Sequence, residues 1–101
     1  MTKEREGGEE DDMRTIYILI KCKLGKTYEV ASKLVEAEDN VPLVHSISGQ
    51  YDLIARFDLR ADDDIGRFVT ERVQKIPEIV DTNTIICFNV FSKDSGIRDD
   101  Q

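Results

Sequence analysis

The sequence is poor in the residues that build metal centres and many catalytic sites. Its 101 residues include one histidine, two cysteines and no tryptophan. The histidine and the cysteines show none of the close spacings, such as CxxC or HxxxH, that hold zinc. We therefore expect no metal, no cofactor and no catalytic residue. We expect the two thiols, Cys22 and Cys87, to be reduced and buried.

Long apolar runs and clusters of basic residues are also missing. No run approaches the ~20 apolar residues that cross a bilayer, and the N-terminus has no apolar signal-peptide core. The net charge is −7, and Lys and Arg do not cluster as they do in proteins that neutralise phosphates. These absences argue against a membrane protein and against direct nucleic-acid binding, and they predict a cytoplasmic location.

The distribution of charge divides the chain into three parts. Residues 1–12 hold six acids and two bases, a composition typical of a disordered acidic tail. Residues 13–91 carry the apolar segments and are expected to form one domain. Residues 92–101 are expected to form a polar C-terminal tail.

The first apolar segment, residues 14–22, predicts a strand with two apolar faces. Side chains such as Ile16 and Ile18 point one way, and Tyr17 and Leu19 point the other. One layer of helices covers only one face of a sheet. We therefore expect a second copy of the chain to cover the other face.

Two helices are predicted from apolar periodicity. Thr27 is a candidate N-cap for a helix that starts at residue 28 and that Asp39-Asn40 ends. Three aspartates at 62–64 favour the N-terminus of a second helix, through capping and the helix dipole. That helix is expected to stop before Pro77, because the residue preceding a proline avoids helical backbone.

A hairpin turn is predicted at Ser48-Gly49-Gln50-Tyr51-Asp52, where Gly49 supplies the positive φ that a tight turn needs. Strands are expected near residues 43–48 and 52–59, and a last strand over about residues 80–91. The element order is then β-α-β-β-α-β. It predicts an α+β, ferredoxin-like fold, with a four-stranded antiparallel sheet and two helices on one face.

Three short motifs follow one another along residues 13–91. They are Val41-Pro42-Leu43-Val44, Ser48-Gly49-Gln50-Tyr51-Asp52-Leu53, and Ile76-Pro77-Glu78-Ile79-Val80-Asp81-Thr82-Asn83-Thr84. In this order and spacing they resemble the effector-binding (RAM) domain of the Lrp/AsnC, or feast/famine, transcription regulators. Glu78 departs from the pattern, which commonly has Gly after the Pro.

The resemblance implies a homodimer formed through the sheets, and assembly of four such dimers into an octamer. It also implies that a small-molecule effector, an amino acid, binds where dimers meet, close to the hairpin turn. Carried over by motif position, the ligand-binding residues are Gly49, Gln50, Tyr51, Asp52, Thr82 and Thr84.

Full regulators of this family carry an N-terminal helix-turn-helix domain, whereas a twelve-residue acidic tail precedes the domain here. We therefore expect a stand-alone binding module, without its own DNA-binding domain, that acts in transcription regulation or metabolite sensing. Full-length Lrp/AsnC regulators are candidate partners.

The residue chemistry suits an amino-acid zwitterion. Asp52 can accept hydrogen bonds from an ammonium group, while backbone N–H groups near Gly49 and a Thr hydroxyl can donate to a carboxylate. The alternative role for Asp52 is to pin the turn by bonding nearby backbone amides. The side chains of the turn do not select one particular amino acid.

Two other functions stay open at this point. Small dimeric α+β barrel enzymes of the monooxygenase type share the β-α-β-β-α-β layout, and fold alone does not decide function. In such an enzyme His45 and Tyr51 would be the candidates for proton transfer. The third function is a structural module that co-assembles with full-length regulators and needs no ligand.

Overall fold

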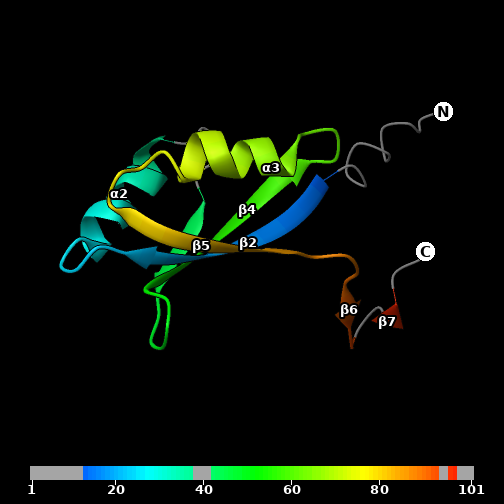
Figure 1. The fold of residues 1–101 in the computed structure, drawn as a ribbon. Helices are drawn as coiled ribbons and strands as arrows, with labels where there is room; N and C mark the ends of the chain where they lie inside the picture. The colour runs from blue at the N-terminus through cyan, green and yellow to red at the C-terminus, as the bar shows by residue number, and fades with distance from the viewer. Residues whose placement is uncertain (1–12, 38–41, 94–95, 98–101) are drawn as a thin grey trace.

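The fold is a twisted antiparallel sheet with helices on one side, as shown by a computed structural model that describes residues 13–37, 42–93 and 96–97 (Figure 1). Four strands form the main sheet in the order β3-β4-β2-β5. Their bounds are Met13–Cys22 for β2, Leu43–Ser46 for β3, Leu53–Arg60 for β4 and Ile79–Ile86 for β5. The order β-α-β-β-α-β and the predicted fold class are confirmed.

Two helical segments cover one face of this sheet (Figure 1). Helix α2 (Thr27–Ala37) connects β2 to β3. Helix α3 (Ile65–Phe68) continues directly into the π-helical segment η1 (Val69–Val73) between β4 and β5. Thr27 is the first residue of α2 and not its N-cap, so the helix begins one residue earlier than predicted. Asp39-Asn40, the predicted end of this helix, and the tail 1–12 lie outside the described residues.

The start of α3 confirms the role expected for the aspartates. The Asp64 carboxylate accepts a hydrogen bond from the Arg67 N–H at 3.1 Å and so caps the helix. Asp63 Oδ2 accepts from the Arg60 N–H at 2.9 Å and closes the turn after β4. These carboxylates are therefore used in local structure.

The core lies between the helices and the sheet face that they cover. The central strands β2 and β4 place Ile16 opposite Phe57 and Ile18 opposite Ala55, all at most 2% exposed. Phe57 also meets Phe68 of α3 edge to face, with ring centroids 5.0 Å apart. The remaining buried apolar side chains are Ile20, Cys22, Val30, Leu34, Leu53, Leu59, Val69, Val73 and Ile76.

The opposite face of the sheet, which we call the open face, is also apolar. Its apolar side chains are those of Met13, Tyr17, Leu19, Leu43, Ile54 and Ile85. None of the described elements covers them, and Leu43 remains 58% exposed. The two-faced pattern predicted for β2 is thus present in the structure.

The last strand is shorter than predicted. It ends at Ile86 instead of residue 91, after which the Cys87 N–H makes one more bond, to the Thr15 carbonyl at 3.0 Å. β5 pairs with β2 in antiparallel fashion, and β2 begins at Met13. Residues beyond Cys87 therefore have almost no partner residues left in β2. Two short strands, β6 (Phe91–Ser92) and β7 (Gly96–Ile97), instead pair with each other apart from the main sheet.

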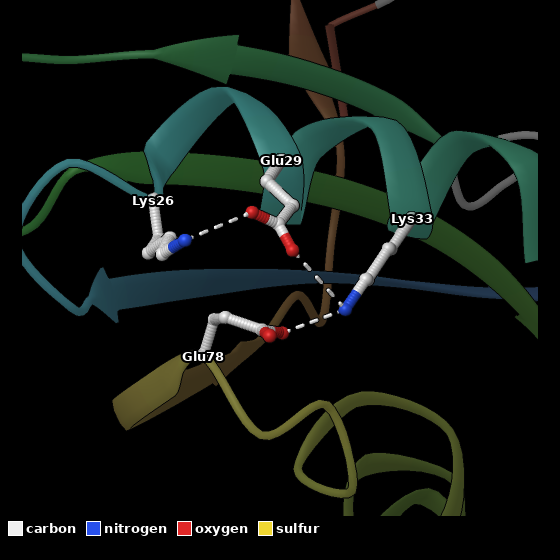
Figure 2. A network of polar contacts seen from close by, with 4 residues as sticks. All are labelled: Lys26, Glu29, Lys33 and Glu78. Carbon is white, nitrogen blue, oxygen red and sulfur yellow. Dashed lines mark hydrogen bonds and ion pairs between the residues drawn. The ribbon is translucent and has the colours of Figure 1, made fainter.

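A polar network ties α2 to the start of β5 (Figure 2). Lys33 Nζ lies 2.8 Å from Glu78 Oε1 and 3.6 Å from Glu29 Oε2, and Lys26 pairs with Glu29 at 3.5 Å. The Glu78 carbonyl accepts from the Lys23 N–H at 2.8 Å. Glu78, where the family pattern commonly has Gly, therefore links helix α2 and the turn after β2 to the start of β5.

We expect Ile18→Ala to destabilise the domain by about 2–5 kcal/mol, because Ile18 is fully buried and its loss leaves a cavity between sheet and helices. Urea unfolding measures the effect. The control is Leu24→Ala, at a side chain that is 99% exposed, which should change the free energy of unfolding by less than ~0.5 kcal/mol. Equal effects of the two substitutions would contradict this location of the core.

Glu78→Gln should lower the melting temperature slightly at neutral pH and have no effect in acid. The hydrogen bond from Lys33 holds the pKa of Glu78 below its ordinary value, so this stabilisation is present above the ordinary carboxyl pKa and is lost as the pH falls through the folded value. Melting curves of both proteins should therefore converge near pH ~3. Glu36→Gln, on the exposed side of α2, is the control, and a constant difference at every pH would refute the ion-pair explanation.

Candidate functional site

The predicted hairpin turn connects β3 to β4 and presents exposed polar residues. Gly49 has a φ of 109°, a backbone conformation that side-chain-bearing residues rarely adopt, so the need for glycine here is confirmed. The Ile47 N–H donates to the Asp52 carbonyl at 2.9 Å and closes the base of the turn. Ser48 and Gln50 are exposed, whereas Tyr51 and Asp52 are half-buried.

Asp52 fixes this turn to the centre of the sheet. Its Oδ2 accepts a hydrogen bond from the Cys22 N–H at 2.8 Å, and its own N–H donates to the Ile20 carbonyl at 2.8 Å. The bonded amide belongs to the last residue of β2, and not to the turn itself. Asp52 thus has the pinning role considered from the sequence, although its partner is 30 residues away in the chain.

Cys22 lies next to this carboxylate and is buried, as predicted. Burial raises the pKa of its thiol, and the charge of Asp52 raises it further, while a hydrogen bond with Thr27 acts in the opposite direction. The thiol is therefore held protonated at neutral pH, which is the opposite of what a nucleophilic cysteine requires. Both cysteines are free, and Cys87 is half-buried, less than predicted.

Thr82 and Thr84 lie on the far side of β2 from the turn. They pair in register with Ile20 and Ile18, whose side chains face the helices, so both hydroxyls are on the helix-facing side of β5. Because β2 separates β5 from β4, the two sets of predicted site residues are two strand spacings, roughly 10 Å, apart. Among the described residues, the hollow that Thr82 lines includes no residue of the turn, and a shared site stays a prediction.

Thr82 does belong to a different feature, a hollow of about 300 Å³ at the start of β5. It is lined by Gln74, Ile79, Val80, Asp81 and Thr82. Gln74 Nε2 donates to Thr82 Oγ1 at 2.8 Å. Nothing in the sequence singles out Gln74, because its partner is on another element and the pairing depends on how η1 meets the sheet.

The residues considered for catalysis, His45 and Tyr51, lie on β3 and in the hairpin turn. His45 is exposed on the edge strand β3, opposite Ile54 of the open face. Within the described ranges no carboxylate forms a hydrogen bond with His45, and no three potential metal ligands come together. Within the same ranges, no helix has the length and apolarity to cross a membrane.

Comparison with known proteins gives a consistent family. The Lrp/AsnC ligand binding domain family matches residues 15–97. The HTH-type transcriptional regulator FL11 of Pyrococcus furiosus is 35% identical over 74 residues, which are 73% of this chain and 48% of that protein. The chain thus spans about half the length of the curated relatives it matches.

Solved structures agree with this result. FFRP-DM1 has 36% sequence identity and a TM-score of 0.64, and the match covers 74% of this chain and 99% of that one. The complex of the transcriptional regulator NMB0573 from Neisseria meningitidis with L-Met shares the fold alone, with 11% identity and a TM-score of 0.70 over 91% of this chain and 59% of that one.

The family match includes the hairpin turn, the helix-to-strand passage at Glu78, and β5, which are the segments that carry the sequence motifs. Relatives above 30% identity and the shared fold lead to the same assignment. This chain belongs to the Lrp/AsnC ligand-binding domain family and is a ligand-binding module of the type found in transcription regulators.

Proposed function

We propose that this chain binds a free amino acid at its hairpin turn and transmits that binding through the assembly of its copies. The observation that carries the proposal is the position of the Asp52 carboxylate. It is half-buried and bonded to β2, at the end of a hairpin turn whose Gly49 is exposed. A fixed carboxylate next to accessible donors can bind a zwitterion without first being ordered, which lowers the entropic cost of binding.

Each charged end of an amino acid has a candidate partner at the turn. Asp52 uses one oxygen for the Cys22 N–H, and the carboxylate has further acceptor capacity for an ammonium group. The exposed backbone at Gly49 and the side-chain amide of Gln50 are donors for the ligand's carboxylate. Tyr51 adds an aromatic surface, half-buried beside them.

In this proposal Thr82 and Thr84 are supplied by a neighbouring copy. In their own chain, β2 lies between these threonines and β4. Thr82 Oγ1 accepts from Gln74, so its own proton is available for a ligand carboxylate. A site made from two copies explains how ligand binding would alter assembly, since each copy contributes only part of it.

The open face is the surface through which we propose that two copies form a homodimer. Three of its polar side chains already contact one another: Thr15 Oγ1 donates to Asp58 Oδ1 at 2.6 Å, and Arg56 Nη2 lies 3.4 Å from the same oxygen. Burying them therefore costs less than burying unpaired polar groups. Four such dimers would form the octamer that brings turns and β5 strands of different copies together.

The wider role that we propose is a cytoplasmic, non-enzymatic sensor in transcription regulation, with full-length Lrp/AsnC regulators as partners. The solved complex of NMB0573 with L-Met supports an amino acid as the effector class. The similarity to FL11, an HTH-type transcriptional regulator, supports a regulatory setting.

Titration calorimetry with each of the twenty amino acids tests the binding proposal. We expect at least one to bind saturably, and Asp52→Asn to weaken that binding by ~10-fold or more, because the hydrogen bond to a charged group is lost. Asn keeps an oxygen for the Cys22 N–H, so the melting temperature should change little. Asp62→Asn, at an exposed carboxylate beyond β4, is the control and should bind like the wild type.

Two results would contradict the proposal. Absence of saturable binding for all twenty amino acids would favour a structural module that co-assembles with full-length regulators. If the Asp52→Asn protein bound the amino acid as tightly as the wild type does, the ligand site would not be at the turn.

A further inference from the structure

The segment after β5 carries apolar side chains that contact little of their own chain. We call residues 87–93 the C-terminal arm. Phe88 is 82% exposed, Val90 70% and Phe91 67%. Three large, exposed apolar side chains within four residues are apolar surface of the kind that a protein normally buries against a partner.

The direction of the arm places this surface beside the open face. After the bond between Cys87 and Thr15 the chain leaves the sheet, and β6 and β7 lie on the side away from α2 and α3 (Figure 1). The arm does not cover the open face of its own chain, because Met13 and Ile85 remain 47% and 46% exposed. Both apolar surfaces thus lie on the same side of the molecule (Figure 1), and no described residue covers either of them.

The arm and the open face are also continuous with each other. A hollow of about 210 Å³ lies at the root of the arm. It is lined by Met13, Arg14, Thr15, Cys87, Phe88, Asn89 and Val90. Met13 and Thr15 belong to the open face, so a second molecule that covers this face would meet the arm as well.

We propose that the C-terminal arm docks on the open face of a second copy of the chain, and that the second copy's arm docks reciprocally on the first. An exchange of this kind is self-complementary, as a two-fold interface requires. The inference rests on the homodimer proposed above, and adds to it a second contact that the sheet alone does not provide.

The apolar area of the arm is large enough to form a substantial part of a dimer interface. A buried aromatic ring removes on the order of 200 Å² from solvent, so four rings, two from each arm, would contribute roughly 800 Å². A stable interface buries about 1,200–2,000 Å² in total. The arms would therefore supply a large part of the contact, and the open faces the rest.

The test compares two triple variants by sedimentation velocity over a dilution series. The arm variant is Phe88→Ser, Val90→Ser and Phe91→Ser. The matched control is Leu24→Ser, Tyr28→Ser and Val35→Ser, which removes three exposed apolar side chains from the loop before α2 and from α2 itself. We expect the arm variant to raise the dimer dissociation constant by more than ~10-fold and the control to leave it within ~3-fold of the wild type.

A photo-cross-linking amino acid at position 91 identifies what the arm touches. With a mixture of isotopically light and heavy chains, we expect cross-links between copies, from the arm to peptides of β2 or β4. Cross-links only within one chain would overturn the arm exchange.

The sedimentation results separate the two proposals. A wild type and an arm variant that dimerise equally well would overturn the arm exchange and leave the sheet-mediated dimer intact. A wild-type chain that stays monomeric at all concentrations would overturn the dimer and the arm exchange together.

Discussion

The structure depends on one constraint: its sheet is apolar on both faces, and its two helices cover only one. In β2 the side chains of Ile16, Ile18 and Ile20 are completely buried, while Tyr17 and Leu19 on the other face are only half-buried. A helix layer on one side cannot satisfy both faces, because the connections in this topology place both helices on the same side. The homodimer proposed above depends on this open face, which is the large apolar surface that the helices leave uncovered.

A second feature of the structure is how the hairpin turn is held, since it lies at the edge of the sheet and not in its core. The bond between the Asp52 carboxylate and the Cys22 N–H holds this turn to the central strand, together with the bond from the Asp52 N–H to the Ile20 carbonyl. The same end of the sheet carries the ion pair between Lys33 and Glu78, which fixes the start of β5. Two polar ties thus position the two halves of the proposed ligand site in separate places. Assembly of copies is the step that would unite them.

Local patterns in the sequence were sufficient for much of this fold. The alternation in β2, the positive φ at Gly49 and the capping by Asp64 depend on neighbours along the chain, and each is found as predicted. The end of β5 at Ile86 was not foreseen, because it depends on where its partner strand begins.

The site was less accessible to sequence reasoning. The partner of Asp52 is 30 residues away in the chain. The side of β2 on which Thr82 lies depends on the order of the strands in the sheet. Such long-range pairings leave no local pattern, so the motif gave the candidate residues without their arrangement in space.

The most direct test of this account is the mass of the chain in solution, measured by sedimentation velocity for the wild type and for Ile85→Asp on the open face. Leu24→Asp, on the fully exposed loop before α2, is the control. The account predicts a wild type and a control of at least twice the chain mass, and an Ile85→Asp protein that is folded but monomeric. A wild-type monomer, or an Ile85→Asp variant that assembles as the wild type does, would contradict burial of the open face.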